Sequence, residues 1–272
     1  MIPLRDNIQP QRTPVVNYTL IGITTVVFLL QFFQDQRAGF QLIHDYGMIP
    51  ARVVNPDESI QRVAEIVDLR RGLVRVQVPV PPGPIPPWLT ILTCIFLHGG
   101  FMHFLGNMWF LYIFGDNVED RLGRVGYVLF YLGTGVAASL TQVLVSSSST
   151  IPTVGASGAI SGVMGAYLLL YPRATVLTIF PFFVFLQVLT VPAWIFLGIW
   201  FLFQFYQGSL SFGYLGESGG VAWWAHIGGF VAGMGVIFLL RARGKLRKQV
   251  DRPRRRSNRR SSRYVRYGRR RY

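Results

Sequence analysis

The feature that most constrains this chain is a series of long apolar runs with almost no charged residues. The hydrocarbon core of a bilayer is about 30 Å thick and needs roughly 20 apolar residues in a helix to cross it. The sequence contains six candidate spans, at 15–33, 101–115 with 88–97 before it, 125–145, 156–171, 191–206 and 222–240. The run at 176–206 is broken by Pro181 and Pro192, so we interpret its first half as an aromatic interfacial segment. The sequence therefore predicts an all-α polytopic membrane protein with a six-helix bundle.

The charged residues are few and unevenly distributed. They make up 14% of the chain, against about 25% in an ordinary soluble domain. Residues 241–272 hold 16 of the 27 Lys and Arg but only one of the 12 acidic residues, so this tail accounts for the net charge of +15. Because basic residues near spans stay in the cytoplasm, we expect a cytoplasmic N-terminus at 1–14, a membrane domain at 15–240 and a disordered cytoplasmic tail at 241–272.

The connections between the spans fit this orientation. The second and fourth carry Arg121, Arg124 and Arg173 and fall inside, whereas the third and fifth lack Lys and Arg and fall outside. The first connection, 34–87, has six Arg and six acidic residues. It is long enough to be exempt from the rule that basic connections stay in the cytoplasm. We expect it to be a large external loop with a short helix and a strand. No A-x-A-like site follows the first span, which favours an anchor over a signal peptide. We expect a multi-pass protein of a bacterial plasma membrane.

The basic tail invites two interpretations. Its run "RPRRRSNRRSSRYVRYGRRRY" resembles a nucleic-acid-binding arm in composition. A juxtamembrane polybasic segment also lies on anionic lipid, with about 1 kcal/mol for each basic residue near the surface. We favour lipid contact and expect no nucleic-acid partner.

Polar residues inside membrane spans are costly and usually functional. Three histidines lie in or near apolar runs, namely His98, His103 and His226. His103 and Asn107 are four residues apart and share a helix face. His98 and His103 are five apart, about 140° around a helix, which disfavours metal chelation. No H-E-x-x-H motif occurs, so we expect neither metal nor cofactor. Cys94, four residues before His98, fits a packed hydrophobe better than half of a thiol dyad.

The segment "TVGASGAISGVMGAY" carries two rows of small residues. Gly158 and Gly162 form one row, and Ser157, Ser161 and Gly165 form the other. Such rows let helix backbones approach closely in lipid. From this segment alone, Ser157 is either a packing residue or a nucleophile.

The segment "WWAHIGGFVAGMG" places a histidine on a second helix face that is lined by small residues. His226, Gly229 and Gly233 lie at i, i+3 and i+7, so the face that packs closely also carries an imidazole. If this face meets the glycine row, His226 comes within reach of Ser157 near the external ends of both helices.

Those residue types suit acyl transfer. A serine hydroxyl needs an adjacent base, which His226 supplies. The usual third member is a carboxylate, but the spans offer none, so we predict a Ser–His dyad without an acid. Asn107, His103 and the backbone N–H of Ser157 are suited to stabilise the developing oxyanion.

Three motifs in combination, "HGGFMHFLGN", "GASGAISG" and "AHIGGFVAG", resemble the rhomboid family of intramembrane serine proteases. The resemblance covers about 88–240. It implies Ser157 as nucleophile, His226 as base and His103 with Asn107 as oxyanion donors, with no metal or cofactor. It also implies cleavage of transmembrane protein substrates near their external ends.

The resemblance further implies supporting roles. Gly155 is the small residue before the serine, Gly158 follows it, and His98 supports a polar, water-holding pocket. Glu119 and Arg121 in "FGDNVEDRLG" are implied to tie the cytoplasmic end together. The fifth span and the loop before the sixth are implied to gate the cavity.

Two departures and two other functions stay open at this stage. Some members carry Tyr one turn after the serine, stacked on the imidazole, where this chain has Ser161. Some members also carry a Trp-Arg pair in the first loop, which we do not find here.

A catalytically dead relative that binds transmembrane segments is one alternative function, and a transporter or channel is the other.

Overall fold

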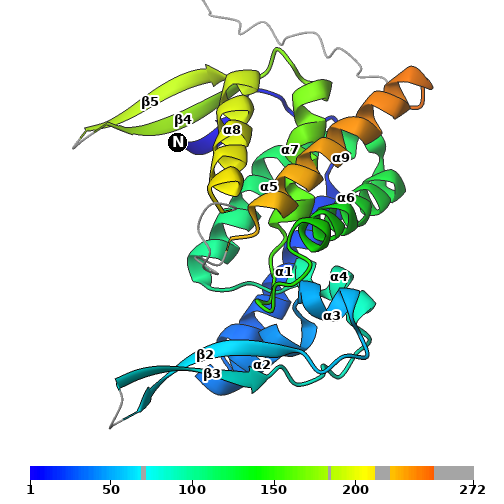
Figure 1. Ribbon diagram of the computed structural model, residues 1–272. Helices are drawn as coiled ribbons and strands as arrows, with labels where there is room; N and C mark the ends of the chain where they lie inside the picture. Colours follow the sequence, from blue (N-terminus) through cyan, green and yellow to red (C-terminus); the bar gives the residue numbers. More distant parts are fainter. Residues whose placement is uncertain (69–71, 183–184, 212–220, 248–272) are drawn as a thin grey trace, which may run out of the picture.

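A computed structural model describes residues 1–68, 72–182, 185–211 and 221–247, and its helices form a bundle (Figure 1). The six long segments of the bundle are α1 (Val15–Phe32), α5 (Phe101–Leu122), α6 (Arg124–Val145), α7 (Ser157–Leu170), α8 (Ala193–Ser211) and α9 (Trp223–Ala242). All six start within two residues of a predicted span. One of them, α5, runs seven residues beyond 115, because its charged end is held by contacts with other segments.

The described residues contain four helices long and apolar enough to cross a membrane, namely α1, α6, α8 and α9. A fifth candidate is the bent pair formed by Pro87–Phe96 and α5, which meet at 78°. The helix α7 has 14 residues and is only about 21 Å long. The chain is therefore a polytopic helical membrane protein with four to five candidate spans by length and composition, fewer than the six expected.

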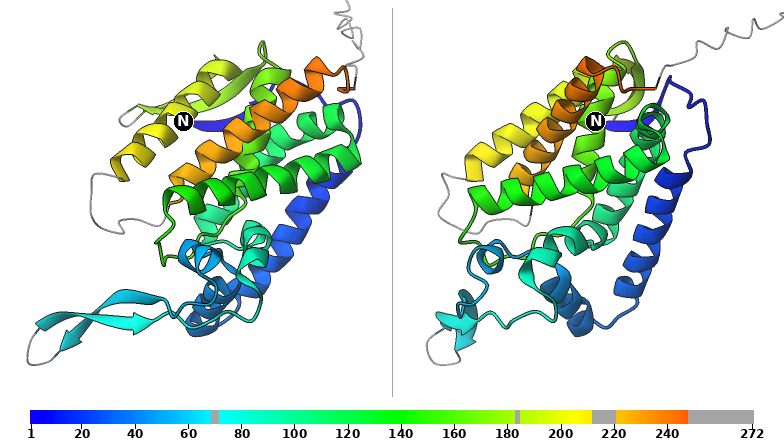
Figure 2. Two further views of the ribbon diagram at one scale, coloured as in Figure 1. Left: turned by 45° about the vertical axis from the view of Figure 1, so that its right-hand side comes forward. Right: turned by 90° about the vertical axis from the view of Figure 1, so that its right-hand side faces the viewer.

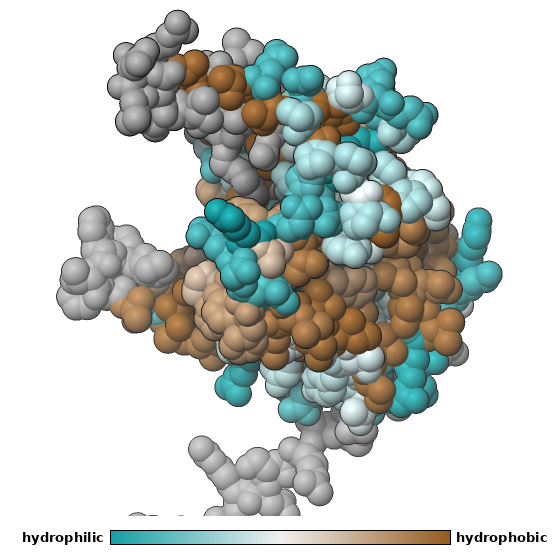
Figure 3. Space-filling view, turned by 90° about the horizontal axis from the view of Figure 1, so that it is seen from below, coloured by the Kyte–Doolittle hydropathy of each residue, from teal (hydrophilic) through white to brown (hydrophobic). Residues whose placement is uncertain are grey.

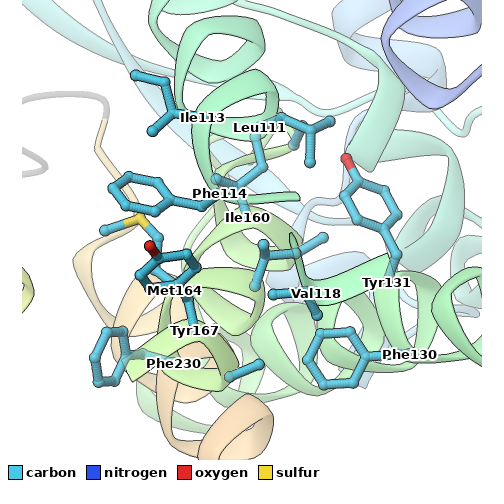
Figure 4. Packing of buried hydrophobic residues seen from close by; sticks show 14 of the residues in the cluster. Leu111, Ile113, Phe114, Val118, Phe130, Tyr131, Ile160, Met164, Tyr167 and Phe230 are labelled. Carbon is cyan, nitrogen blue, oxygen red and sulfur yellow. The ribbon is translucent and has the colours of Figure 1, made fainter. Parts of the chain in front are cut away.

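The short helix α7 lies in the centre of the bundle, between α5, α6 and α9 (Figure 1). Eleven of its 14 residues are buried. Figure 4 shows the core around it, where the rings of Phe114 and Tyr167 pack edge to face with their centroids 5.0 Å apart. Because its neighbours surround it, α7 does not need the length of a lipid-facing span, and its first residue lies within the protein.

The outward faces of the surrounding helices are apolar. Leu144 of α6, Leu202 of α8 and Phe238 of α9 are large and exposed. Seen from the end that carries β2 and β3, apolar side chains form a broad brown area (Figure 3). An exposed apolar surface of this kind suits contact with lipid acyl chains rather than water.

Two small antiparallel sheets show that the all-α prediction was incomplete. One has the order β1–β4–β5 and joins β1 (Ile2–Asp6) to the hairpin of β4 (Thr175–Phe182) and β5 (Phe185–Pro192). The expected interfacial segment is this hairpin. Its β-branched and aromatic residues favour strands, and Thr175 pairs with Pro192 at its base.

The first connection contains two helices and a hairpin, more than the short helix and strand expected. They are α2 (Gln36–Tyr46), α3 (Pro50–Val54), β2 (Gln61–Asp68) and β3 (Gly72–Pro79). Arg52 is buried and donates hydrogen bonds to the carbonyl oxygens of His44 and Pro81, which fastens α3 to the segments on either side. The β2–β3 hairpin and the β4–β5 hairpin extend from opposite ends of the bundle (Figure 2).

A polar cluster closes the end of the bundle near β1. The carboxylate of Glu119 accepts hydrogen bonds from the backbone N–H groups of Val16 (3.1 Å) and Asn17 (2.7 Å). These are free donors at the start of α1, where negative charge is stabilising. Arg121 donates from Nε to the carbonyl oxygen of Arg247 (2.9 Å). Glu119 and Arg121 thus join three segments, while most of the basic tail, from 248 onward, lies outside the described residues.

Candidate active site

The helices α7 and α9 meet along their glycines. A Cβ atom on Gly229 would lie 2.0 Å from the carbonyl oxygen of Gly158, and one on Gly233 would lie 2.0 Å from that of Gly162. Each glycine of α9 therefore packs directly on the backbone of α7, in the way small-residue rows allow. This contact brings the first turn of α9 beside the first turn of α7.

Ser157 and His226 are hydrogen-bonded at this crossing. Nε2 of His226 lies 2.8 Å from Oγ of Ser157, and Nδ1 lies 2.7 Å from Oε1 of Gln204. A carboxamide oxygen only accepts hydrogen bonds, so Nδ1 carries the imidazole proton and Nε2 accepts from the serine hydroxyl. The imidazole is thus arranged to take a proton from Ser157.

Gln204 was missed by the sequence analysis. It lies on α8 and is 5% exposed. Its only sequence signal is that a polar residue interrupts the apolar run "WIFLGIWFLFQFY". No local spacing connects it to His226, because the contact depends on how α8 crosses α9.

Two tryptophans pack around the same imidazole. The ring centroid of Trp200 lies 6.0 Å from that of His226, and Trp223 lies edge-on at 6.2 Å. Ser161, one turn after Ser157, donates to the carbonyl oxygen of Ser157 (2.6 Å) and is 1% exposed. The structure therefore holds the imidazole with residues of α8 and α9, and the hydroxyl of Ser161 is used within α7.

Asn107 and His103, both on α5, face the same space as Ser157. Asn107 is 7% exposed, and among the described residues its Nδ2 has no hydrogen-bond partner. An unpaired buried donor costs about 1–3 kcal/mol, which is unusual in a packing residue. Nδ1 of His103 accepts from the N–H of Gly99 (3.4 Å), which leaves Nε2 as the protonated nitrogen. Two side-chain donors are thus available beside Ser157.

Gly155 and Gly158 shape the approach to the serine. Gly155 has φ +126°, and a Cβ atom there would lie 2.7 Å from Cε1 and Nε2 of His103. A Cβ atom on Gly158 would lie 2.6 Å from Cβ of Ala138. Since Ser157 is the first residue of α7, its backbone N–H has no acceptor within the helix. This N–H is a third donor at the same point.

These groups line a cavity of about 1020 Å³. Its walls come from α5, α6, α7, α8 and α9, and the loop between α6 and α7 lines it with several serines. The polar groups that converge in it are Ser157, His226, Gln204, Asn107 and His103. A site of this size accommodates a ligand as large as an extended peptide segment.

His98 and Cys94 lie outside this set of polar groups. His98 is fully buried, its ring lies 5.2 Å from that of His103, and it is absent from the cavity lining. Its ring packs against that of His103 and does not line the cavity. Cys94 borders the cavity, but its Sγ contacts Oγ of Ser139 (3.5 Å) rather than the ring of His98. No group of three or more metal-ligating side chains occurs within the described residues.

The fold and the cavity define an integral membrane protein whose polar groups converge inside a helical bundle. The Rhomboid domain profile matches residues 86–243, more than half of the chain. The chain therefore belongs to the rhomboid family.

Individual relatives match stretches of different lengths. The chain is 44% identical over 77 residues to Rhomboid-like protein 11, chloroplastic, of Arabidopsis thaliana, covering 28% of this chain and 27% of that protein. It is 32% identical over 166 residues to RHOMBOID-like protein 1 of the same plant, covering 60% and 38%. It is 36% identical over 81 residues to the Putative rhomboid protease YdcA of Bacillus subtilis (strain 168), covering 30% and 40%. The chain thus spans well under half the length of these curated relatives, which come from a plant and a bacterium.

Proposed function

We propose that this protein is a serine endopeptidase that cleaves transmembrane segments of other proteins near the external membrane face. The observation that carries the proposal is the 2.8 Å hydrogen bond from Ser157 Oγ to His226 Nε2 inside a large cavity. The unpaired Nδ2 of Asn107 in the same cavity adds support. Two similar proteins of Bacillus subtilis (strain 168) are named as proteases, the Putative rhomboid protease YdcA and the Rhomboid protease GluP.

In the proposed reaction, Oγ of Ser157 attacks the scissile carbonyl carbon while Nε2 of His226 accepts the hydroxyl proton. The carbonyl oxygen becomes an oxyanion that Asn107 Nδ2, His103 Nε2–H and the N–H of Ser157 stabilise. The C–N bond then breaks, and the leaving amine takes the proton from His226. Water entering the cavity hydrolyses the acyl-enzyme, with His226 again as base, and restores the free serine.

The proposal includes an arrangement in the membrane. Six helices cross or enter the bilayer, with α7 as the short central member and the loop at 34–87 external. Both termini are cytoplasmic, the domain boundaries fall at 15 and 240, and the membrane is a bacterial plasma membrane. The tail at 241–272 lies on anionic lipid. Support comes from the charge distribution and from the opposite placement of the first loop and the β1–β4–β5 sheet.

A cleavage assay tests the function directly. Purified protein in detergent is incubated with a reporter transmembrane substrate, and Ser157→Ala and His226→Ala are each expected to abolish cleavage while the thermal stability is kept. Ser209→Ala removes an exposed hydroxyl of α8 and is the matched control, expected to cleave at the wild-type rate. Cleavage by purified Ser157→Ala at the wild-type rate would rule out the nucleophile.

Covalent labelling separates a protease from the alternative functions. A fluorophosphonate probe is expected to modify Ser157, as identified by mass spectrometry, and to leave Ser157→Ala and His226→Ala unlabelled. A binding-only relative or a transporter has no need of an activated serine, so unlabelled wild-type protein would favour one of them.

A further inference from the structure

We propose that Gln204 is a positioning residue that holds the catalytic imidazole in its productive tautomer, the role that a carboxylate has in Ser–His–Asp triads. The inference rests on the proposed function, because it assigns a role within the same Ser157–His226 site. It comes from the 2.7 Å contact between Oε1 of Gln204 and Nδ1 of His226.

The tautomer of His226 decides whether it can act as a base. A neutral imidazole carries its proton on one nitrogen and accepts with the other. With the proton on Nδ1, Nε2 is free to take the proton of Ser157. The opposite tautomer points an N–H at the serine and cannot accept from it. An acceptor facing Nδ1 therefore selects the reactive form, which is the role of the carboxylate in Ser–His–Asp triads.

Gln204 is the hydrogen-bond acceptor that faces Nδ1 in the structure. Among the described residues, the groups around the ring include the hydroxyl of Ser157, the carboxamide of Gln204 and the indoles of Trp200 and Trp223. Within the described residues, no carboxylate lies within 4.0 Å of the imidazole. The carboxamide is 5% exposed, so little water competes for Nδ1.

A neutral acceptor also suits the depth of the site. An ionised carboxylate inside a membrane helix is costly unless it is paired. A carboxamide oxygen accepts the same hydrogen bond without bringing a second charge into the bundle. Trp200 and Gln204 are four residues apart and therefore share one face of α8. That face both covers the imidazole and fixes its proton, so α8 supports catalysis directly.

Steady-state kinetics on two substitutions at this position test the role. Gln204→Leu removes the acceptor at similar volume and is expected to lower kcat about 10- to 100-fold, with KM changed less than about twofold. Gln204→Glu keeps an acceptor and is expected to recover most of that loss. Gln207→Leu, at a half-buried glutamine three residues further along α8, is the matched control and should behave as wild type.

The kinetic outcomes are decisive in both directions. Wild-type kcat in Gln204→Leu, an effect on KM alone, or equal losses in the Leu and Glu variants would overturn the positioning role. If the wild-type protein shows no cleavage that depends on Ser157, the proposed function fails instead, and the tautomer must be tested without kinetics.

Nitrogen NMR provides that test and does not require any Gln204 variant to fold. With ¹⁵N-labelled histidine, the signals of His226 are identified by their loss in His226→Ala. The wild-type protein is expected to show a protonated Nδ1 and an unprotonated Nε2 at neutral pH. A predominantly protonated Nε2 would refute the inference, whatever the activity.

Discussion

Gly233 of α9 lies against the backbone of Gly162 in α7, where a Cβ atom would come within 2.0 Å of the carbonyl oxygen and 2.7 Å of Cα. The atoms it would meet are backbone atoms, which cannot turn aside as a flexible side chain can. This contact sets how closely α7 and α9 approach, two turns away from His226. The distance between His226 and Ser157 therefore depends on a residue that touches neither of them.

Gly233→Ala is expected to weaken both the fold and the proposed activity. The added methyl group forces the helices apart, at a cost of about 1–3 kcal/mol for an overpacked contact, and cleavage should fall at least tenfold. Gly235→Ala, on the same helix with nothing within 4 Å of its Cβ position, is the control. It should melt at or above the wild-type temperature, because Ala favours a helix by up to about 1 kcal/mol. Equal melting temperatures and cleavage rates for the two variants would show that the contact of Gly233 with α7 does not limit how closely the two helices pack.

Gly155→Ala is expected to reduce cleavage more than it reduces stability. The backbone at φ +126° disfavours any side chain, at a cost of about 1–3 kcal/mol. The Cβ atom would also displace the ring of His103, which it would approach to 2.7 Å. Gly133→Ala has open space around the added atom and serves as control. Thermal melting and the cleavage assay, run side by side, distinguish the two effects, and an unchanged rate would argue against His103 as an oxyanion donor.

Asn107→Ala and Asn107→Asp are expected to lower kcat about 10- to 1,000-fold, the range for losing one of several oxyanion donors. Both variants remove the unpaired Nδ2, and the aspartate keeps the shape of the side chain. Stability should hold or rise in the alanine variant, because the buried donor has no partner among the described residues. A drop in melting temperature together with an unchanged kcat would assign Asn107 to structure instead of catalysis.

Asp6 is expected to make the stability of the folded protein pH-dependent. Burial raises the pKa of Asp6 from 3.8 to about 6, and it outweighs the hydrogen bond from Tyr167, which lowers that pKa. Between about pH 4 and pH 6 the unfolded chain is ionised at this residue while the folded protein keeps its proton. The free energy of unfolding therefore falls as the pH rises through this window, by about 1–2 kcal/mol after discounting for partial exposure.

The test is the melting temperature from pH 4 to 7. Asp6→Asn should remove this part of the pH dependence and raise the melting temperature at pH 7, since its Oδ1 still accepts from Tyr167 and from Nδ2 of Asn117. Asp57→Asn, at an exposed acid of the first loop, is the control and should follow the wild-type curve. If the melting temperature of Asp6→Asn depends on pH as strongly as that of the wild type, Asp6 is excluded as the source of this dependence.

Much of the fold is readable from the sequence because hydropathy is a local property. The starts of the long helices fall within two residues of the predicted spans. The end of α5 was misplaced because its charged residues read as a connection, and only the distant N–H groups of Val16 and Asn17 explain why Glu119 lies in a helix there. The β1–β4–β5 sheet was missed for a related reason. The apolar run at 175–192 suits an interfacial segment equally well until β1, some 170 residues earlier, pairs with it.

For the candidate site, the sequence by itself determined which side chains share a face. The seven-residue spacing placed His226 on the same helix face as Gly233, and the four-residue spacing placed His103 on the same face as Asn107. Both could be predicted because helix periodicity is a property of the local chain. Only the tertiary structure decided that α7 is a short helix starting inside the bundle, that His98 packs against His103, and that Gln204 faces Nδ1 of His226. These features depend on where separate helices cross, and crossing is set by packing between residues far apart in the chain.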